Sequence, residues 1–378
     1  MDGDGHGWTP MKGERSSMAS TLKSPRKDHG NHWFSGALLP WYREYHRALP
    51  WRKTKDPYRV WLSEVILQQT RVDQGRAYWD RFVQRYPTVQ DLAAAHEDDV
   101  LKLWQGLGYY SRARNLLTAA RQVVHVFGGR FPSTHIDLLK LKGVGDYTAS
   151  AIASICFGQP DAVVDGNVYR VLARAFGIDT PIDSTEGRQQ FKALAQELID
   201  PASPGDHNQA VMELGATVCT PRNYTCVLCP LQPKCIAFAT GRVHQVPVKA
   251  STPKTRDRFF NYLHIRTAKG MYLRQRTGKD IWQGLFELPL VESGKSLTKR
   301  TFIAEVERQF GSGWTIAAKS EEVKHVLSHQ IIHAVFWEVM PPKGYKVPKG
   351  WSDVNGLSLD KYAVPRLIEK WITRHQDP

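Results

Sequence analysis

The sequence predicts a mostly α-helical region followed by a smaller α+β region. From about residue 31 to residue 240, apolar residues recur at spacings of three and four, and short loops carry Gly or Pro, which is typical of packed helices. Beyond residue 256 the pattern changes to short runs rich in β-branched and aromatic residues, FFNYLHIRT, MYLRQR and HAVFWEVM, which predict strands. The segment LTKRTFIAEVERQFG (297–311) predicts a helix among them, so the second region combines helices and strands.

The length and charge of the chain limit the number of domains and the classes of partner that we expect. A chain of 378 residues is long enough for two or three domains. Lys and Arg outnumber Asp and Glu by 51 to 37, a net charge of +14 that favours a polyanionic partner, with nucleic acid the first candidate. No uninterrupted apolar stretch approaches the roughly 20 residues that a membrane span needs, so we expect no membrane partner.

The ends of the helical region have their own composition. Residues 1–30 are rich in Gly, Ser and charge and have no apolar signal-like core, which predicts a disordered tail. Residues 241–258 carry five Lys or Arg against one Asp, with two prolines and no helical period, which predicts a basic linker over 241–255. The expected domains are therefore a helical one over 31–240 and a second one over 256–378.

The stretch PYRVWLSEVILQQT (57–70) predicts a helix with one unusual residue. Asp56 suits the N-cap and Pro57 the first turn. Glu64 is the single carboxylate in an otherwise apolar run. Taken alone, this favours a glutamate that is paired with Arg or lies on a narrow solvent-facing stripe, because Glu is almost never fully buried unless it is paired.

Four cysteines are clustered in CTPRNYTCVLCPLQPKC. They are Cys219, Cys226, Cys229 and Cys235, in a Cys-x6-Cys-x2-Cys-x5-Cys pattern. Four thiolates on one compact loop can wrap a tetrahedral zinc ion or an iron–sulfur cluster, and their chemistry alone leaves both open. The clustering indicates a metal site instead of a disulfide framework, and hence a reducing compartment.

Two further segments suggest a binding surface. In LLKLKGVGDYTASAIASI (138–155), Gly143 and Gly145 predict a tight turn before a helix, where backbone N–H groups can bind a phosphate, although such a pair of glycines is also a common helix connection. In VVDGNVYRVLARAFG (163–177), Asp165 is predicted to cap a helix. A capping carboxylate stays ionised and can still face a site.

Together with LPWR and GLGYYSRARNL, these segments resemble adenine DNA glycosylases of the MutY type, within the endonuclease III superfamily of helix-hairpin-helix glycosylases, throughout residues 33–240. The resemblance implies a six-helix barrel (52–155) and a cluster module (31–51 plus 156–240) in which the four cysteines hold a 4Fe-4S cluster, with zinc the alternative. The C-terminal part resembles the family's Nudix-like lesion-recognition domain. It lacks the spaced Glu residues with which Nudix hydrolases hold Mg²⁺, so we expect recognition and no phosphohydrolase activity.

The family removes adenine mispaired with 8-oxoguanine or guanine and leaves an abasic site. The resemblance assigns the general acid to Glu64 and the carboxylate that stabilises the oxocarbenium ion to Asp165, with Tyr147 and Asn167 supporting. Bifunctional relatives place a Lys two residues after the second Gly of the hairpin. This chain has Tyr147 there, which implies a monofunctional glycosylase without Schiff-base lyase activity.

The resemblance also implies three sets of binding residues. Those of the adenine pocket are Arg47, Leu49, Trp51, Leu67 and Gln209. Those that contact the duplex or 8-oxoguanine are Gln69, Thr70, Leu107, Tyr109, Ser328 and His329. Those of the hairpin that contact phosphate are Gly143, Val144 and Gly145. Plain core packing is an equal interpretation of Trp51, Leu67 and Leu107, and an ordinary turn histidine is an equal interpretation of His329. Leu327 stands where the family has Phe, which weakens any stacking there.

The expected partner is double-stranded DNA with an A:8-oxoguanine or A:G mispair, bound by a monomer inside the cell, in the cytoplasm or nucleoid if the source is bacterial. Two alternatives remain. One is an endonuclease III-like bifunctional glycosylase/lyase, which Tyr147 and Glu64 oppose. The other is a non-catalytic iron–sulfur DNA-binding protein, which would be expected to lack Glu64 or Asp165, yet both are present.

Overall fold

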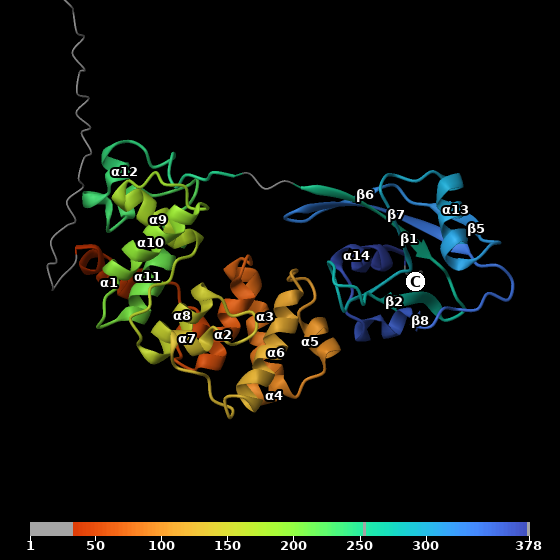
Figure 1. Ribbon diagram of the computed structural model, residues 1–378, viewed down its shortest axis with the longest axis horizontal. Helices are drawn as coiled ribbons and strands as arrows, with labels where there is room; N and C mark the ends of the chain where they lie inside the picture. Colours follow the sequence, from red (N-terminus) through yellow and green to blue (C-terminus); the bar gives the residue numbers. More distant parts are fainter. Residues whose placement is uncertain (1–32, 252–254, 376–378) are drawn as a thin grey trace, which may run out of the picture.

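A computed structural model describes residues 33–251 and 255–375, so the predicted tail over 1–30 lies outside the described residues. The helical region and the α+β region lie side by side and are joined by the segment that leads into strand β1 (Figure 1). The first region consists of α1 (Trp33–Tyr45), η1 (Pro50–Arg52), α2 (Pro57–Leu67), α3 (Val72–Arg85), α4 (Val89–Ala93), α5 (Glu97–Leu103), α6 (Ser111–His125), α7 (His135–Leu138), α8 (Asp146–Phe157), α9 (Gly166–Phe176), α10 (Thr185–Leu198), α11 (Pro204–Thr217), η2 (Cys226–Leu228), η3 (Gln232–Lys234) and α12 (Ile236–Ala239). Within the described residues, no helix is both long enough and apolar enough to cross a membrane.

Two hydrophobic cores hold the helical region together. The first lies among α2 to α8 and buries Trp61, Phe82 and Trp104 almost completely. The second lies among α1 and α9 to α12 and buries Phe34 and Phe191. The repeat of apolar residues at three and four positions places these side chains on the inner face of each helix, where removing apolar surface from water contributes about 25 cal/mol per Å². The predicted helical fold is confirmed.

The second region is built on two sheets. Its elements are β1 (Arg256–His264), β2 (Gly270–Gln275), β3 (Phe286–Glu287), β4 (Leu290–Ser293), α13 (Lys299–Phe310), β5 (Thr315–Lys319), β6 (Val323–Val326), β7 (Gln330–Met340), β8 (Trp351–Asn355), η4 (Gly356–Lys361) and α14 (Arg366–His375). In the larger sheet β1 and β7 are parallel neighbours, β4 pairs with β1, and β5 and β6 pair with β7; in the smaller sheet β2 lies between β3 and β8.

The alternation of side chains along β1 and β7 explains why helices cover both faces of the larger sheet. Phe260 and Phe336 pack into the core that α14 completes, whereas Leu263 and Trp337 pack into the core that α13 completes. Successive residues of a strand point to opposite faces, so a strand buried on both sides is apolar almost throughout. The predicted α+β character is confirmed.

The two regions are docked against each other through α5 and α6. Leu285 and Ala363, from the second region, are buried in the first core of the helical region. Beside them, Gln105 Nε2 donates to Glu369 Oε1 at 2.8 Å. These contacts hold the α+β region against the segment that leads from α5 into α6.

The predicted basic linker is partly packed onto the helical region. Val243 and Val246 are buried in the second core. Farther along, Asp183 accepts hydrogen bonds from the backbone N–H groups of Ala250, at 2.8 Å, and Ser251, at 3.1 Å. The two valines outweigh the polar composition of this stretch, so it follows the surface of the helical region up to residue 251 instead of forming an open spacer.

Candidate active site

A cavity of about 190 Å³ lies among α2, α8, α9, α11 and the segment around η1; we call it the carboxylate cavity because Glu64, Asp165 and Glu213 line it. It brings together ten of the predicted site residues: Arg47, Leu49, Trp51, Glu64, Leu67, Thr70, Tyr147, Asp165, Asn167 and Gln209. These positions span more than 160 residues of sequence, so the packing of the two helical cores against each other creates the site.

Glu64 projects from the middle of α2 into this cavity, and its side chain is buried. The Tyr147 hydroxyl, from α8, donates to Glu64 Oε2 at 2.6 Å. Burial, together with the negative charge of Asp165, raises the pKa of Glu64 to about 7, although the hydrogen bond from Tyr147 and the positive charge of Arg52 both lower it. Glu64 is neither on a solvent-facing stripe nor paired with Arg, and it can hold or release a proton near neutral pH.

Asp165 caps α9, as predicted, and is held in one orientation. Its Oδ1 accepts the backbone N–H groups of Asn167 and Val168, both at 2.8 Å, and its Oδ2 accepts Asn167 Nδ2 at 2.8 Å. Arg170 Nη2 in turn donates to Asn167 Oδ1 at 2.7 Å. Burial raises the pKa of Asp165, and the hydrogen bonds from Val168 and Asn167, which favour the ionised form, offset part of that rise.

Glu213, on α11, is the third carboxylate of the cavity; it is fully buried and has a different environment. Arg47 donates Nε to Oε1 at 2.8 Å and Nη2 to Oε2 at 2.7 Å, and Arg52 Nη2 donates to Oε2 at 2.8 Å. Burial alone would raise the pKa of Glu213, but the hydrogen bonds from Arg47 and Arg52 outweigh burial and lower it to about 2. Glu213 therefore stays ionised and remains hydrogen-bonded to the guanidinium groups of Arg47 and Arg52.

Sequence reasoning missed Glu213, Arg52 and Met212, which also line the carboxylate cavity. Met212 Sδ lies 3.4 Å from the Tyr147 hydroxyl. A signal for Glu213 did exist, because it stands alone in the apolar helix segment AVMELGA just as Glu64 stands alone in its own helix. Nothing in the sequence, however, indicates that Glu213 and the arginines of η1 meet.

A second cavity, of about 440 Å³, lies between the helical region and the α+β region; we call it the interdomain cavity. It brings together four of the six residues predicted to contact the duplex or 8-oxoguanine: Leu107, Tyr109, Ser328 and His329. Across it the Tyr109 hydroxyl and Ser328 Oγ share a hydrogen bond. Ser328 and His329 lie in the turn between β6 and β7, so His329 is a turn residue that also faces the cavity, while Leu107 both lines the cavity and packs in the first core.

Gln69, the remaining predicted duplex contact with Thr70, is exposed just beyond the end of α2. Its backbone lies in the left-handed region, with φ at +56°, as does that of Tyr109, with φ at +46°. Such a conformation is uncommon for residues other than Gly. Arg112 donates to three backbone carbonyl oxygens at the end of α2, among them Gln68 O at 2.5 Å, and so anchors the chain directly before the exposed Gln69.

The glycine hairpin connects α7 to α8. Gly143 has φ at +77°, and a Cβ there would lie 2.7 Å from Asn115 Cβ, so only Gly fits. Gly143 and Gly145 are exposed, whereas Val144 is buried and its N–H donates to Leu141 O at 3.1 Å. A phosphate contact therefore suits the two glycines, while the Val144 amide serves the turn itself.

The four predicted cysteine ligands line one small cavity at the far end of the helical region. Arg174, buried beside them, has Nη1 at 3.4 Å from Cys219 Sγ and stacks over the Tyr224 ring at 4.9 Å. Within the described residues, no three Cys, His, Asp or Glu side chains are placed to hold a single metal ion. The four cysteines thus share one cavity, as the predicted ligand set requires.

Both regions of the chain match known protein families. Residues 62–199 match the family described as "HhH-GPD superfamily base excision DNA repair protein", and residues 261–374 match the NUDIX domain. The adenine DNA glycosylase of Homo sapiens is 51% identical over 227 residues, which cover 58% of this chain and 41% of the human protein. The adenine DNA glycosylase of Buchnera aphidicola subsp. Schizaphis graminum (strain Sg) is 38% identical over 258 residues, 68% of this chain and 74% of that protein. The chain belongs to the adenine DNA glycosylase family.

The chain also resembles the solved structure of a thermostable thymine-DNA glycosylase. The TM-score is 0.51 and the sequence identity 29%, and the match covers 55% of this chain and 96% of that one. The chain spans less than half the length of the human relative. Family membership and the two matched regions confirm the predicted helix-hairpin-helix and Nudix-like fold.

Proposed function

We propose that this chain is a monofunctional adenine DNA glycosylase, which removes adenine mispaired with 8-oxoguanine or guanine from duplex DNA and leaves an abasic site. The observation that carries the proposal is the buried Glu64, whose pKa of about 7 and hydrogen bond from Tyr147 suit a general acid at neutral pH. Family membership supports the same substrate base.

The carboxylate cavity holds the groups that hydrolysis of an N-glycosidic bond requires. Adenine leaves readily only when protonated, so Glu64 donates its proton to a ring nitrogen of the base. The bond between C1′ and the base then breaks, its electron pair goes to adenine, and the sugar becomes an oxocarbenium ion that the Asp165 carboxylate stabilises. Water adds to C1′, and the proton it loses returns to Glu64. Asn167 keeps Asp165 in the orientation that this step needs.

Adenine must leave the base stack to reach these groups, because stacking hides the glycosidic bond. The cavity, at about 190 Å³, is smaller than the roughly 300–1,000 Å³ of pockets for drug-sized ligands, which suits one extruded base. Leu49, Trp51 and Leu67 supply apolar walls for it, and Arg47 and Gln209 supply polar edges.

The base opposite the adenine is proposed to enter the interdomain cavity, beside Tyr109 and Ser328, while the exposed Gln69 enters the duplex. The backbone N–H groups of Gly143 and Gly145, which are both exposed residues, are proposed to bind a phosphate. We propose that the chain acts as a monomer on DNA inside the cell.

We propose a 4Fe-4S cluster, in preference to zinc, at Cys219, Cys226, Cys229 and Cys235. The four thiols line one shared cavity, and the resemblance to the endonuclease III superfamily, which holds a 4Fe-4S cluster on this cysteine spacing, favours the cluster. The buried Arg174 guanidinium beside Cys219 would offset the negative charge of a thiolate-bound cluster. Such a cluster would cross-link the loop between α11 and α12. The test is a visible absorption band together with iron and acid-labile sulfide in the purified protein; zinc in place of both would overturn the assignment.

The function is tested with duplexes that carry A opposite 8-oxoguanine, G or T, each assayed before and after treatment with alkali. We expect base loss only in the A:8-oxoguanine and A:G duplexes and strand cleavage only after alkali, because Tyr147 occupies the position of a lyase lysine. Cleavage of an oxidised-pyrimidine duplex without alkali would support the bifunctional alternative. Binding without base loss from any duplex would support the non-catalytic one.

A further inference from the structure

Three residues other than glycine in the described part of the chain have a left-handed backbone. They are Gln69, Tyr109 and Trp282, with φ at +56°, +46° and +59°. For a bulky aromatic residue this conformation is strained, and it persists only where the surroundings hold it, often at functional sites. Gln69 and Tyr109 already have proposed contacts to DNA, whereas Trp282 has no assigned role.

Trp282 lies in the turn between β2 and β3 and lines the interdomain cavity with Tyr109 and Ser328. Its ring meets those of Phe260, at 6.0 Å and 79°, and His325, at 5.8 Å and 61°. It also touches both the first helical core and the core beneath α14, yet it remains partly exposed. The indole is therefore packed on the protein side and open on the cavity side.

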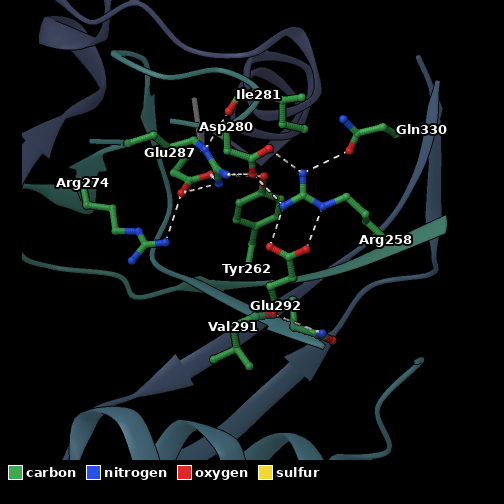
Figure 2. Close-up of polar contacts among 11 residues, drawn as sticks. Arg258, Tyr262, Arg274, Asp280, Ile281, Glu287, Val291, Glu292 and Gln330 are labelled. Carbon is green, nitrogen blue, oxygen red and sulfur yellow. Dashed lines mark hydrogen bonds and ion pairs between the residues drawn. The ribbon is translucent and has the colours of Figure 1, made fainter. Parts of the chain in front are cut away.

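A buried guanidinium ties the Trp282 turn to the Ser328 turn. Arg258, only 7% exposed, donates to Asp280 at 2.9 and 2.6 Å, to both carboxylate oxygens of Glu292 at 2.7 Å and to Gln330 Oε1 at 3.0 Å. Figure 2 shows Arg258 between these three partners. Asp280 precedes Trp282 by two residues, and Gln330 directly follows His329; both line the interdomain cavity. The two turns are thus fixed relative to each other before any ligand enters.

We propose that Trp282 stacks on the base opposite the excised adenine. The proposal rests on the proposed function. The β6–β7 turn offers an aliphatic Leu327 beside Ser328, and the lining of the cavity includes the large, partly exposed rings of Trp282 and Tyr109, whereas Tyr110 is buried. A base has a flat face that binds an indole and an edge that binds a hydroxyl. Stacking on Trp282 would present that edge to Ser328.

Removal of the opposite base provides the test. The duplexes carry 2′-fluoro-2′-deoxyadenosine, whose fluorine prevents loss of the base, opposite either 8-oxoguanine or a tetrahydrofuran abasic residue. The proteins are the wild type, W282L, W282F and W351L. Trp351 is the matched control, a partly buried tryptophan of β8 that packs on Tyr272 and Phe310 away from the interdomain cavity. Dissociation constants are measured for each combination, with thermal melts of each protein.

We expect W282L to bind the 8-oxoguanine duplex about tenfold to a hundredfold more weakly than the wild type, the range seen for loss of one base–aromatic stack. W282F should lose less, and W351L should lose nothing. On the tetrahydrofuran duplex all four proteins should bind alike, because the contact has no base to meet. Equal losses by W282L on both duplexes, or no loss on either, would overturn the proposal.

If W282L melts below the assay temperature, W282F decides the outcome, because it keeps an aromatic ring in the same place. Weaker binding by W282F to the 8-oxoguanine duplex alone supports stacking. Unchanged binding to that duplex overturns it. Failure of the wild type to remove ordinary adenine opposite 8-oxoguanine would overturn the proposed function instead. The binding comparison does not depend on excision, so the two failures are distinguishable.

Discussion

Two buried glutamates line the same cavity, and their neighbours give them opposite charge states. Glu213 accepts hydrogen bonds from Arg47 and Arg52 and has its pKa lowered to about 2. Glu64 accepts one from the neutral Tyr147 hydroxyl, and burial raises its pKa to about 7. Burial acts on both in the same direction, so the difference comes from where the cations are placed.

The comparison also explains why Glu213 is needed. Arg47 and Arg52 both lie at the wall of the carboxylate cavity, and an unpaired guanidinium there would stabilise the ionised form of Glu64. Glu213 holds both in fixed hydrogen bonds. We interpret it as the residue that holds both cations in place: the charge of Arg52 still lowers the pKa of Glu64, but it is the smallest of the named effects and burial outweighs it, so Glu64 can carry a proton.

The largest expected effect comes from removing the acid. Glu64→Gln keeps the size of the side chain and a hydrogen-bonding partner for Tyr147 but cannot donate a proton as a carboxylic acid does. General acid–base catalysis contributes roughly 10²–10⁴-fold, so single-turnover excision of adenine should fall by at least about that factor. Duplex binding should stay within a few-fold of the wild type. Excision by this variant near the wild-type rate would remove Glu64 from the mechanism.

Replacing Glu213 should lower both the stability of the protein and the pKa of Glu64. Glu213→Gln leaves two guanidinium groups without their carboxylate, and breaking a buried ion pair costs about 3–5 kcal/mol, so the melting temperature should drop. In the folded fraction, a freed guanidinium lowers the pKa of Glu64, and the decline of excision rate at high pH should begin at lower pH. Glu305→Gln, which breaks an exposed pair with Arg308, is the control and should cost less than about 1 kcal/mol. An unchanged pH profile of excision in Glu213→Gln would show that Glu213 does not influence the pKa of Glu64.

The raised pKa of Glu64 predicts a stability effect with a definite sign. Between about pH 4.5 and 7 the folded protein keeps a proton on Glu64 that the unfolded chain releases, so this contribution to stability is complete below pH 4.5 and is lost as pH rises through 7. Glu64→Gln avoids the loss. Its melting temperature should therefore exceed that of the wild type more at pH 8 than at pH 5, with a gap in unfolding free energy of about 3 kcal/mol at most. A gap that is constant with pH would show that Glu64 titrates normally.

Local features of the site could be read from the sequence, whereas long-range partners could not. Asp56 caps α2 and Asp165 caps α9 as predicted, because a cap depends on residues two or three positions away. The pairing of Arg47 with Glu213 joins residues 166 positions apart, and the entry of Leu285 into a helical core joins two regions. The periodicity of apolar residues predicts that such residues are buried. Only the tertiary structure shows which residues they contact. The resemblance to a family named some of the residues in each cavity; it did not indicate Glu213, Arg52, Met212 or Trp282.

The smallest expected effect concerns the single hydrogen bond that Glu64 does accept. That bond lowers the pKa of Glu64 against the effect of burial, so Tyr147→Phe should raise the pKa further and extend excision to higher pH. The maximal rate should fall only about tenfold or less, because a hydrogen bond to an uncharged partner is worth about 0.5–1.5 kcal/mol. Tyr58→Phe is the matched control: Tyr58 is also buried, but its hydroxyl donates to Tyr86 O at 2.7 Å, so its loss should lower the melting temperature and leave the pH profile of excision unchanged. A shift of the Tyr147→Phe profile toward lower pH would mean that the hydroxyl favours the acid form of Glu64, and the contrast between Glu64 and Glu213 would then rest on the arginines alone.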